Sequence, residues 1–138
     1  HTDVIKGIVS PGFRNSVETE VASMLAELER IYLGVYYVAD LSERVLARIV
    51  SYGERMSSVI VSGIIDGITL RDSMQFIRTV SCRGRNRLDT EATSRLVAEH
   101  LAEASMPGAL TLVQGFISTD ASGEITNLGR GGSDYTAA

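Results

Sequence analysis

The residues best suited to chemistry lie near the C-terminus, where glycines at 129, 131 and 132 surround Arg130 and lead directly into Ser133 and Asp134. Glycine lets backbone amides approach a ligand closely, and a guanidinium donates paired hydrogen bonds to a carboxylate or phosphate. An apolar run at 109–113 precedes this turn, and Thr136-Ala137-Ala138 favours a helix after it. The whole string predicts an anion site at a strand-to-helix junction. A glycine-rich loop alone would also suit an ordinary turn.

A second segment with chemical potential reads Ser51-Tyr52-Gly53-Glu54-Arg55-Met56-Ser57-Ser58. Gly53 interrupts a run of apolar residues at helical spacing, and glycine inside a helix costs roughly 1 kcal/mol relative to alanine. We expect a kink there that points the Glu54 carboxylate into a site. The alternative from the residues alone is a plain joint between two helices with Glu54 on a solvated face.

The remaining reactive residue types suggest no site. Arginines at 78, 83, 85 and 87 form a basic cluster that we interpret as a solvated loop. Cys82 has no histidine–acid pattern near it and is expected to be structural or exposed in a loop. With His1, His100 and one cysteine, the 138-residue chain has no zinc-type ligand cluster, and we expect no metal site of its own. His100 is expected at a helix surface or core edge.

Composition limits the class of protein. A net charge of −4 argues against nucleic-acid partners, and 44% hydrophobic with 22% charged residues is ordinary for a globular domain. A single cysteine cannot form an internal disulfide, which suits a reducing cytosol, so we expect a cytoplasmic protein. No apolar run approaches the ~18 residues of a membrane span.

Apolar spacing predicts two long helical regions in the first half. Residues 1–15 read as a leader that ends in a turn at 10–12. A helix then begins with Asn15 as N-cap and Glu18 as capping-box partner and ends near Gly34. The next helix has Asp40 as N-cap, breaks at Gly53 and resumes to about residue 64.

The second half mixes strands with short helices. We expect a strand at 67–70, a helical turn at 72–77, and a basic loop at 80–88. Asp89 or Thr90 caps a helix that ends at Pro107-Gly108. A strand at 109–113, buried on both faces, and a hairpin turn at 120–123 follow. Such alternation predicts an α/β layered fold. Without further partner strands this strand would expose an edge, so we expect lower stability or a homo-oligomer.

Three segments together resemble the aspartate kinase family. The string Leu128 to Ala138, preceded by Gly115-Phe116-Ile117, is very specific to that family, and Gly53 to Ser58 is similar to a second family segment. Phe76-Ile77-Arg78-Thr79 is a weaker similarity. The resemblance covers 16–138 and is closest to the kinase part of bifunctional aspartokinase–homoserine dehydrogenases. It implies part of the amino-acid-kinase three-layer αβα sandwich, with a mostly parallel central sheet.

The resemblance also implies an activity and a set of site residues. Aspartate kinases transfer the γ-phosphoryl group of ATP, with Mg²⁺, to the side-chain carboxylate of L-aspartate, the first step toward lysine, threonine and methionine. Carried onto this chain, Arg130 pairs a substrate carboxylate and Glu54 accepts a hydrogen bond from the substrate ammonium. Further substrate contacts come from the Phe116 wall, the Ser133 hydroxyl and the amides of Gly131 and Gly132. Asp134 is the catalytic candidate; it orients Arg130 or nearby donors, or else caps the last helix.

Departures from the family pattern shape the expectation for this chain. The family opens with Lys-Phe-Gly-Gly-Thr-Ser, which handles the transferred phosphate, and has a nucleotide-binding half after the glycine-rich turn; neither is found in this sequence. We therefore expect 16–138 to be the amino-acid-substrate side of a kinase domain, inactive by itself. Two alternatives stay open: a non-catalytic module that binds aspartate or a subunit, and a kinase for another acid such as glutamate.

Overall fold

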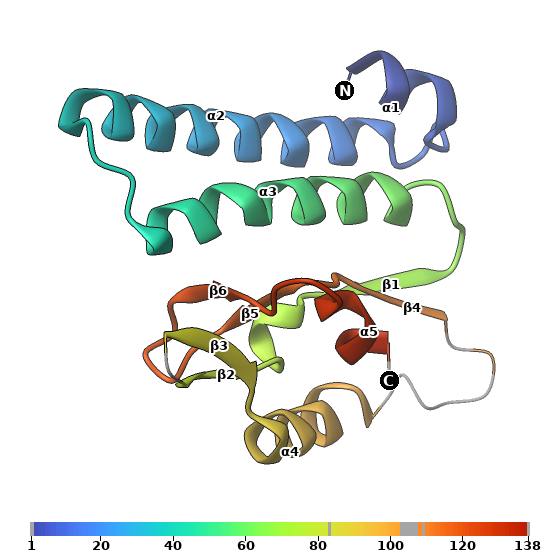
Figure 1. Ribbon diagram of the computed structural model, residues 1–138. Helices are drawn as coiled ribbons and strands as arrows, with labels where there is room; N and C mark the ends of the chain where they lie inside the picture. The colour runs from blue at the N-terminus through green and yellow to red at the C-terminus, as the bar shows by residue number, and fades with distance from the viewer. Residues whose placement is uncertain (1, 83, 103–107, 109, 138) are drawn as a thin grey trace. The chain divides into compact units, whose positions relative to one another are not determined.

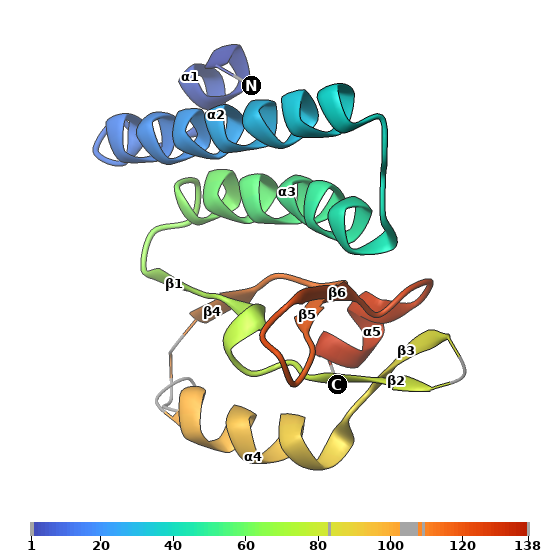
Figure 2. The same cartoon turned by 90° about the vertical axis from the view of Figure 1, so that its left-hand side faces the viewer.

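The computed structural model describes residues 2–82, 84–102, 108 and 110–137 (Figure 1). The chain forms two compact units, His1–Ile68 and Thr69–Ala138. The first is helical and contains α1 (Thr2–Ile8), α2 (Arg14–Val38) and α3 (Glu43–Ser62). Helices α2 and α3 lie side by side and antiparallel in both views (Figures 1 and 2). Among the described helices, none combines the length and apolar character that a membrane crossing requires.

Apolar side chains from α1, α2 and α3, and from Val9 just after α1, form the core of the helical unit. Burying such a side chain stabilises the fold by about 1.5–3 kcal/mol. The helix faces that carry apolar residues at helical spacing are therefore the faces that pack together. Seven of the apolar side chains are almost fully buried: Ile5, Val9, Val17, Val21, Met56, Val59 and Ile60. The expected turn after the first segment is confirmed, since the Phe13 N–H donates to the Ser10 carbonyl (3.0 Å). The segment before it is folded as α1 and packs on α2.

Gly63 joins the end of α3 to the first part of the chain. Its carbonyl accepts a hydrogen bond from the Ser10 N–H (3.1 Å). A Cβ at this position would lie 2.7 Å from Val17 Cγ2 and 2.9 Å from Val9 Cγ1. Because both valines are buried and β-branched, they have little freedom to move, so the close approach depends on glycine.

The predicted boundaries of α2 are wrong at both ends. The helix begins at Arg14 after Phe13, which makes no side-chain capping bond, so Asn15 is not the N-cap. It also continues past Gly34 to Val38 and ends at Ala39, whose φ is 54° and whose N–H bonds to the Val35 carbonyl. Gly34 has open space around it and simply lies within the helix.

The predicted start and break of α3 are also wrong. Ser42, rather than Asp40, is the N-cap, and its hydroxyl accepts from the Val45 N–H (3.3 Å). The helix then runs without interruption from Glu43 to Ser62. Gly53 therefore marks no kink, because an uninterrupted run of helical hydrogen bonds tolerates one glycine at a modest cost.

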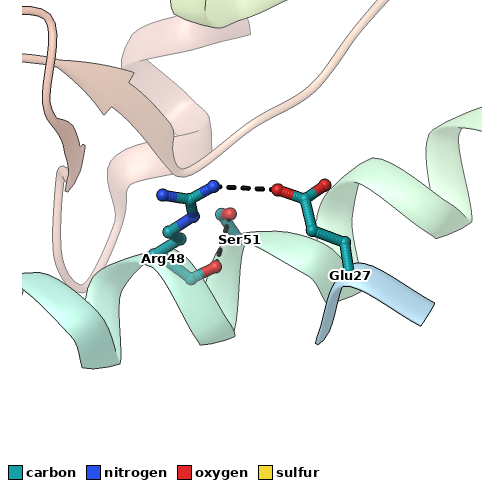
Figure 3. A network of polar contacts seen from close by, with 3 residues as sticks. All are labelled: Glu27, Arg48 and Ser51. Carbon is teal, nitrogen blue, oxygen red and sulfur yellow. Dashed lines mark hydrogen bonds and ion pairs between the residues drawn. The ribbon is translucent and has the colours of Figure 1, made fainter. Parts of the chain in front are cut away.

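A polar cluster between α2 and α3 surrounds the buried Tyr52 ring. Arg48 Nη2 lies 2.8 Å from Glu27 Oε1, and the Ser51 hydroxyl donates to the Arg48 carbonyl (2.7 Å) (Figure 3). Arg55 stacks over the Tyr52 ring at 4.9 Å. The nearby Tyr52 hydroxyl, followed by Arg48, lowers the pKa of Glu27. Burial raises the pKa of Tyr52, whose hydroxyl has no hydrogen-bond partner within the usual distance among the described residues.

The second unit alternates short strands and helices. Strand β1 (Ile68–Arg71), which begins at the unit boundary, pairs with β4 (Leu110–Val113), and β5 (Ile117–Thr119) pairs antiparallel with β6 (Ile125–Asn127). Three helical segments accompany them: the 3-10 turn η1 (Ser73–Gln75), α4 (Thr90–His100) and α5 (Gly132–Ala137). The mixture confirms the α/β class predicted from the sequence.

The predicted basic loop is instead a β-hairpin. Strands β2 (Thr79–Cys82) and β3 (Arg85–Leu88) pair antiparallel, with Val80 opposite Arg87. Gly84 adopts a φ of +74° in the connection, a conformation that glycine adopts without steric cost. Arg83 lies outside the described residues, and Cys82 is half-buried.

Arg78 precedes this hairpin and is a structural residue rather than part of a solvated loop. Its guanidinium donates to the Met74 carbonyl (2.8 Å), the Thr119 hydroxyl (2.6 Å) and the Gln75 carbonyl (3.0 Å). Hydrogen bonds to charged groups are worth about 1.5–3 kcal/mol. The side chain thus ties η1 to the end of β5.

Other predictions for the second unit have mixed outcomes. The Asp89 cap is confirmed, since its carboxylate accepts from the Ala92 N–H (3.0 Å). His100 is exposed at the end of α4, near Phe76, as expected. The predicted end of this helix at Pro107-Gly108 is wrong, since α4 ends at His100 with Leu101 as C-cap; Pro107 itself lies outside the described residues. Strand β4, which was expected to be buried on both faces, is less buried than predicted: its Leu110 is 49% exposed.

Candidate active site

The corner Gln114–Ile117 joins β4 to β5 and is anchored by Ser73 of η1. The Ser73 N–H donates to Gln114 Oε1 (2.9 Å), and the Ser73 hydroxyl donates to the Ile117 carbonyl (3.2 Å). All three residues are buried, with exposures of 0% for Ser73, 5% for Gln114 and 0% for Ile117. Buried polar groups require such partners, so the two ends of the corner are fixed by one serine.

Phe116, at the centre of this corner, has an unusual backbone. Its φ is +69°, a left-handed conformation that is uncommon for a bulky residue and costs of order 1–3 kcal/mol. The Ile117 N–H bonds to the Gly115 carbonyl (2.7 Å), and the Leu128 N–H bonds to the Phe116 carbonyl (2.9 Å). The corner is therefore held against the segment that enters the glycine-rich turn, with the half-buried Phe116 at its tip.

The glycine-rich turn begins directly after Leu128. Gly129 and Gly131 have φ values of +74° and +78°, and the Gly132 N–H bonds to the Gly129 carbonyl (3.0 Å). Gly132 is buried, and a Cβ there would lie 2.6 Å from Leu128 Cβ. The predicted turn-to-helix junction is confirmed, since α5 begins at Gly132.

Gly115 brings the corner and the first turn of α5 into direct contact. A Cβ on Gly115 would lie 2.6 Å from Ser133 Oγ and 3.2 Å from Ser133 Cα. Only a residue without a side chain permits this approach. Ser133, one of the predicted site residues, therefore lies against Gly115 inside the corner, next in sequence to Phe116, another of them.

Arg130 and Ser133 nevertheless line different clefts. Arg130 lines a cleft of about 400 Å³, and Ser133 lines another of about 380 Å³. The first cleft is lined by Asn86, Arg87, Leu88, Thr90, Leu128, Arg130 and Tyr135. The second is lined by Thr111, Leu112, Val113, Gly115, Ser133, Thr136 and Ala137. The turn thus presents its cation and its hydroxyl to separate spaces.

The cleft at Arg130 contains a second cation that the sequence interpretation missed. Arg87 of β3 lines it, although we assigned Arg87 to a solvated loop. Within the described ranges, neither guanidinium has a hydrogen-bond or ion-pair partner, and both side chains are exposed. The available signal was the alternation of polar and apolar residues in Thr79-Val80-Ser81-Cys82 before Gly84; Arg85–Leu88 itself shows no such alternation.

The two acidic residues of the predicted site lie in different units. Glu54 is half-buried on α3 of the helical unit, where its carbonyl accepts hydrogen bonds from Ser57 and Ser58. Asp134 is exposed in the first turn of α5, and its N–H bonds to the Gly131 carbonyl (3.1 Å). The assignment of Glu54 to substrate binding and that of Asp134 to catalysis both stay predictions. In the part of the chain that the structure describes, no cluster of three or more His, Cys, Asp or Glu residues could hold a metal ion.

Comparison with known proteins gives the family. No protein-family model matches the chain. Lysine-sensitive aspartokinase 3 of Escherichia coli is 34% identical over 121 residues, which cover 81% of this chain and 27% of that protein. Aspartokinase 1, chloroplastic, of Arabidopsis thaliana is 33% identical, covering 85% and 22%. Bifunctional aspartokinase/homoserine dehydrogenase 2 of E. coli is 28% identical, covering 98% and 16%.

Solved structures agree with the sequence relatives. E. coli aspartokinase III in complex with lysine and aspartate superposes with a TM-score of 0.81 at 25% identity, covering 99% of this chain and 36% of that one. Aspartate kinase of Clostridium acetobutylicum shares the fold, with a TM-score of 0.58 at 19% identity, covering 84% and 23%. The chain spans about a quarter or less of the curated relatives it matches. Over that span, its sequence and its fold show that it belongs to the aspartokinase family.

Proposed function

We propose that the protein containing this chain transfers the γ-phosphoryl group of ATP to the side-chain carboxylate of L-aspartate, giving 4-phospho-L-aspartate and ADP. The observation that carries the proposal is the unpaired Arg130 guanidinium. It lines a cleft without acidic residues, next to a glycine-rich turn, among the residues that the structure describes. Arginine in such a cleft suits a small carboxylic acid. Family membership selects aspartate among the possible acids.

Structures of the relatives support the same choice of ligands. One E. coli aspartokinase III structure is a complex with lysine and aspartate, and another, at a TM-score of 0.66 and 26% identity, is a complex with aspartate and ADP. We infer that the corresponding segment of this protein contributes to an aspartate site. The nucleotide is proposed for the whole protein rather than for this chain.

The reaction asks for positioning and charge neutralisation rather than proton transfer. A carboxylate oxygen of aspartate attacks the γ-phosphorus, a new oxygen–phosphorus bond forms, and the bond to the β-phosphate oxygen breaks as ADP leaves. The acceptor carboxylate is ionised near neutral pH, so it needs no general base. Holding two anionic reactants in line therefore falls to cations and backbone amides.

Each predicted site residue has a role in that positioning. Arg130 pairs a substrate carboxylate, and Glu54 accepts a hydrogen bond from the ammonium. As the family resemblance implies, the amides of Gly131 and Gly132 and the Ser133 hydroxyl donate to the substrate, while Phe116 forms a wall. Because Ser133 lines the neighbouring cleft rather than that of Arg130, its hydrogen bond requires a substrate that reaches both clefts. Since no base is required, we assign Asp134 an orienting role toward Arg130 and the neighbouring donors.

ATP supplies the phosphoryl group, and Mg²⁺ accompanies it in kinases of this kind. No acidic cluster that fits a metal ion occurs in the described residues, so we assign Mg²⁺ no residue here and route no step through it. We expect the 138-residue chain by itself to give no turnover.

An ATP-dependent hydroxamate assay tests the proposal. The complete protein is assayed with L-aspartate and L-glutamate, alongside Arg130→Gln and the control Arg85→Gln, which changes an exposed arginine that does not line the Arg130 cleft. We expect product with aspartate only, a loss of at least about tenfold in kcat/KM for Arg130→Gln, and little change for Arg85→Gln. If neither acid gives product, the alternative of a non-catalytic aspartate-binding module is favoured, and the roles above would be withdrawn.

A further inference from the structure

The Arg130 cleft has a composition that the proposed function does not fully use. Of the seven lining residues that the structure describes, Arg87 and Arg130 are cations and none is an acid. Asn86 and Thr90 add polar side chains, and Leu88, Leu128 and Tyr135 add apolar area. Its volume of about 400 Å³ lies within the range of roughly 300–1,000 Å³ that is usual for small-molecule sites.

Both cations are free to bind a ligand. No hydrogen bond or ion pair occupies either guanidinium among the described residues. Two acids, Asp89 and Asp134, are adjacent in sequence to lining residues. Asp89 is engaged as the N-cap of α4 through the Ala92 N–H (3.0 Å), and the exposed Asp134 carboxylate makes no ion pair with either arginine among the described residues. Two like charges that share one cleft repel each other, and an anion placed between them removes that repulsion.

The fold fixes Arg87 and Arg130 on separate supports. Arg87 is held by the β2–β3 pairing, opposite Val80, whereas Arg130 sits between the two left-handed glycines of the turn, Gly129 and Gly131. Cations on independent elements suit a ligand with two separated anionic groups better than a single carboxylate.

We propose that Arg87 and Arg130 together hold the two carboxylates of a small dicarboxylic acid, so that Arg87 is a specificity-determining residue. The identification of that acid as L-aspartate rests on the proposed function. Arg130 pairs one carboxylate, Arg87 pairs the other, and Asn86 and Thr90 supply further hydrogen bonds. Discrimination against the monoamide L-asparagine follows, because an amide leaves one guanidinium without an anion.

Calorimetric titration of the complete protein tests this arrangement with three probes: L-aspartate, L-asparagine, and succinate, which has two carboxylates and no ammonium. The variants are Arg87→Gln, Arg87→Lys, Arg130→Gln and, as the matched control on the same strand, Arg85→Gln. Thermal unfolding of each variant identifies any that fail to fold. For a misfolded Arg87→Gln, Arg87→Lys serves as the second variant.

We expect Arg87→Gln to weaken aspartate and succinate binding by about tenfold or more, with Arg87→Lys intermediate because it keeps the charge without the planar fork. The preference for aspartate over asparagine should shrink in Arg87→Gln and persist in Arg85→Gln. Higher ionic strength should weaken binding, since both guanidiniums are exposed.

The possible failures are distinguishable. If aspartate binds, and depends on Arg130 but not on Arg87, this inference is overturned and the proposed function stands. If succinate binding depends on both arginines while aspartate is not phosphorylated, the dicarboxylate cleft stands and the proposed function fails. If no dicarboxylate binds the folded protein, both are wrong.

Discussion

Two glycines of α3 allow a matched test of the helical unit. Gly53 lies within the continuous helix Glu43–Ser62, and a Cβ there would meet nothing within 4 Å. Gly63 is the C-cap with a φ of −81°, also in the right-handed region, but its added Cβ would meet two buried valines. The substitutions Gly53→Ala and Gly63→Ala therefore add the same methyl group to similar backbones with different surroundings.

The two substitutions should change the free energy of unfolding in opposite directions. Alanine at 53 should stabilise the protein by about 0.5–1 kcal/mol, which is the usual gain over glycine inside a helix. Alanine at 63 would approach Val17 Cγ2 to 2.7 Å and Val9 Cγ1 to 2.9 Å. Those valines are only 5% and 2% exposed, so the methyl group overpacks the core and costs about 1–3 kcal/mol.

Urea unfolding followed by far-ultraviolet circular dichroism measures both effects. With a denaturant slope of about 1–3 kcal/mol per molar, the two midpoints should differ by about 0.5–4 M. A lower midpoint for Gly53→Ala would refute the uninterrupted α3 and restore the kink expected from the sequence. An unchanged or higher midpoint for Gly63→Ala would refute the close approach to the valines.

Three further outcomes are expected. Gly115→Ala should destabilise the protein by about 1–3 kcal/mol and weaken aspartate binding, because the methyl group displaces Ser133; Gly53→Ala is the steric control, and unchanged binding would contradict the contact. Glu27→Gln should cost under about 1 kcal/mol at pH 7, since both partners of the Glu27–Arg48 pair are exposed. Because the pKa of Glu27 is lowered by folding, its contribution is present at neutral pH and lost as the pH falls through that lowered value; a gap in unfolding free energy that widened in acid would oppose this. Arg78→Lys should destabilise by about 1.5–3 kcal/mol in chemical unfolding, and a neutral result would count against the guanidinium network.

Local signals in the sequence predicted the parts of the fold that depend on local chemistry. Asp89 caps α4 because a carboxylate accepts N–H bonds at a helix start. Asp120 forms the expected hairpin turn, where its carboxylate accepts from the Ser122 and Glu124 N–H groups. The glycines at 129 and 131 predicted the turn into α5, because glycine readily adopts the positive φ values that both residues have there.

The errors arose where a local signal was weaker than the interpretation placed on it. We predicted that α2 ends near Gly34, yet the helix continues to Val38, although Tyr36, Tyr37 and Val38 are 71–79% exposed. One glycine inside a helix costs only about 1 kcal/mol, which does not suffice to end it. The cluster of arginines was interpreted as a loop because only Thr79–Cys82 alternates polar and apolar residues, whereas Arg85–Leu88, on the other side of Gly84, is mostly charged or polar. Pairing of those segments is what brings Arg87 to the Arg130 cleft, and no local pattern in one sequence reports that contact.

The anchoring of the corner by Ser73 has a consequence for the order of folding. Its two hydrogen bonds join residues 41 and 44 positions apart, and the Thr79–Thr126 hydroxyl bond joins residues 47 apart. Closing such long loops is slow compared with the pairing of adjacent helices. We expect α2 and α3 to associate early and the corner Gln114–Ile117 to form late, so that a nascent chain has its helical hairpin well before Phe116 reaches its left-handed conformation.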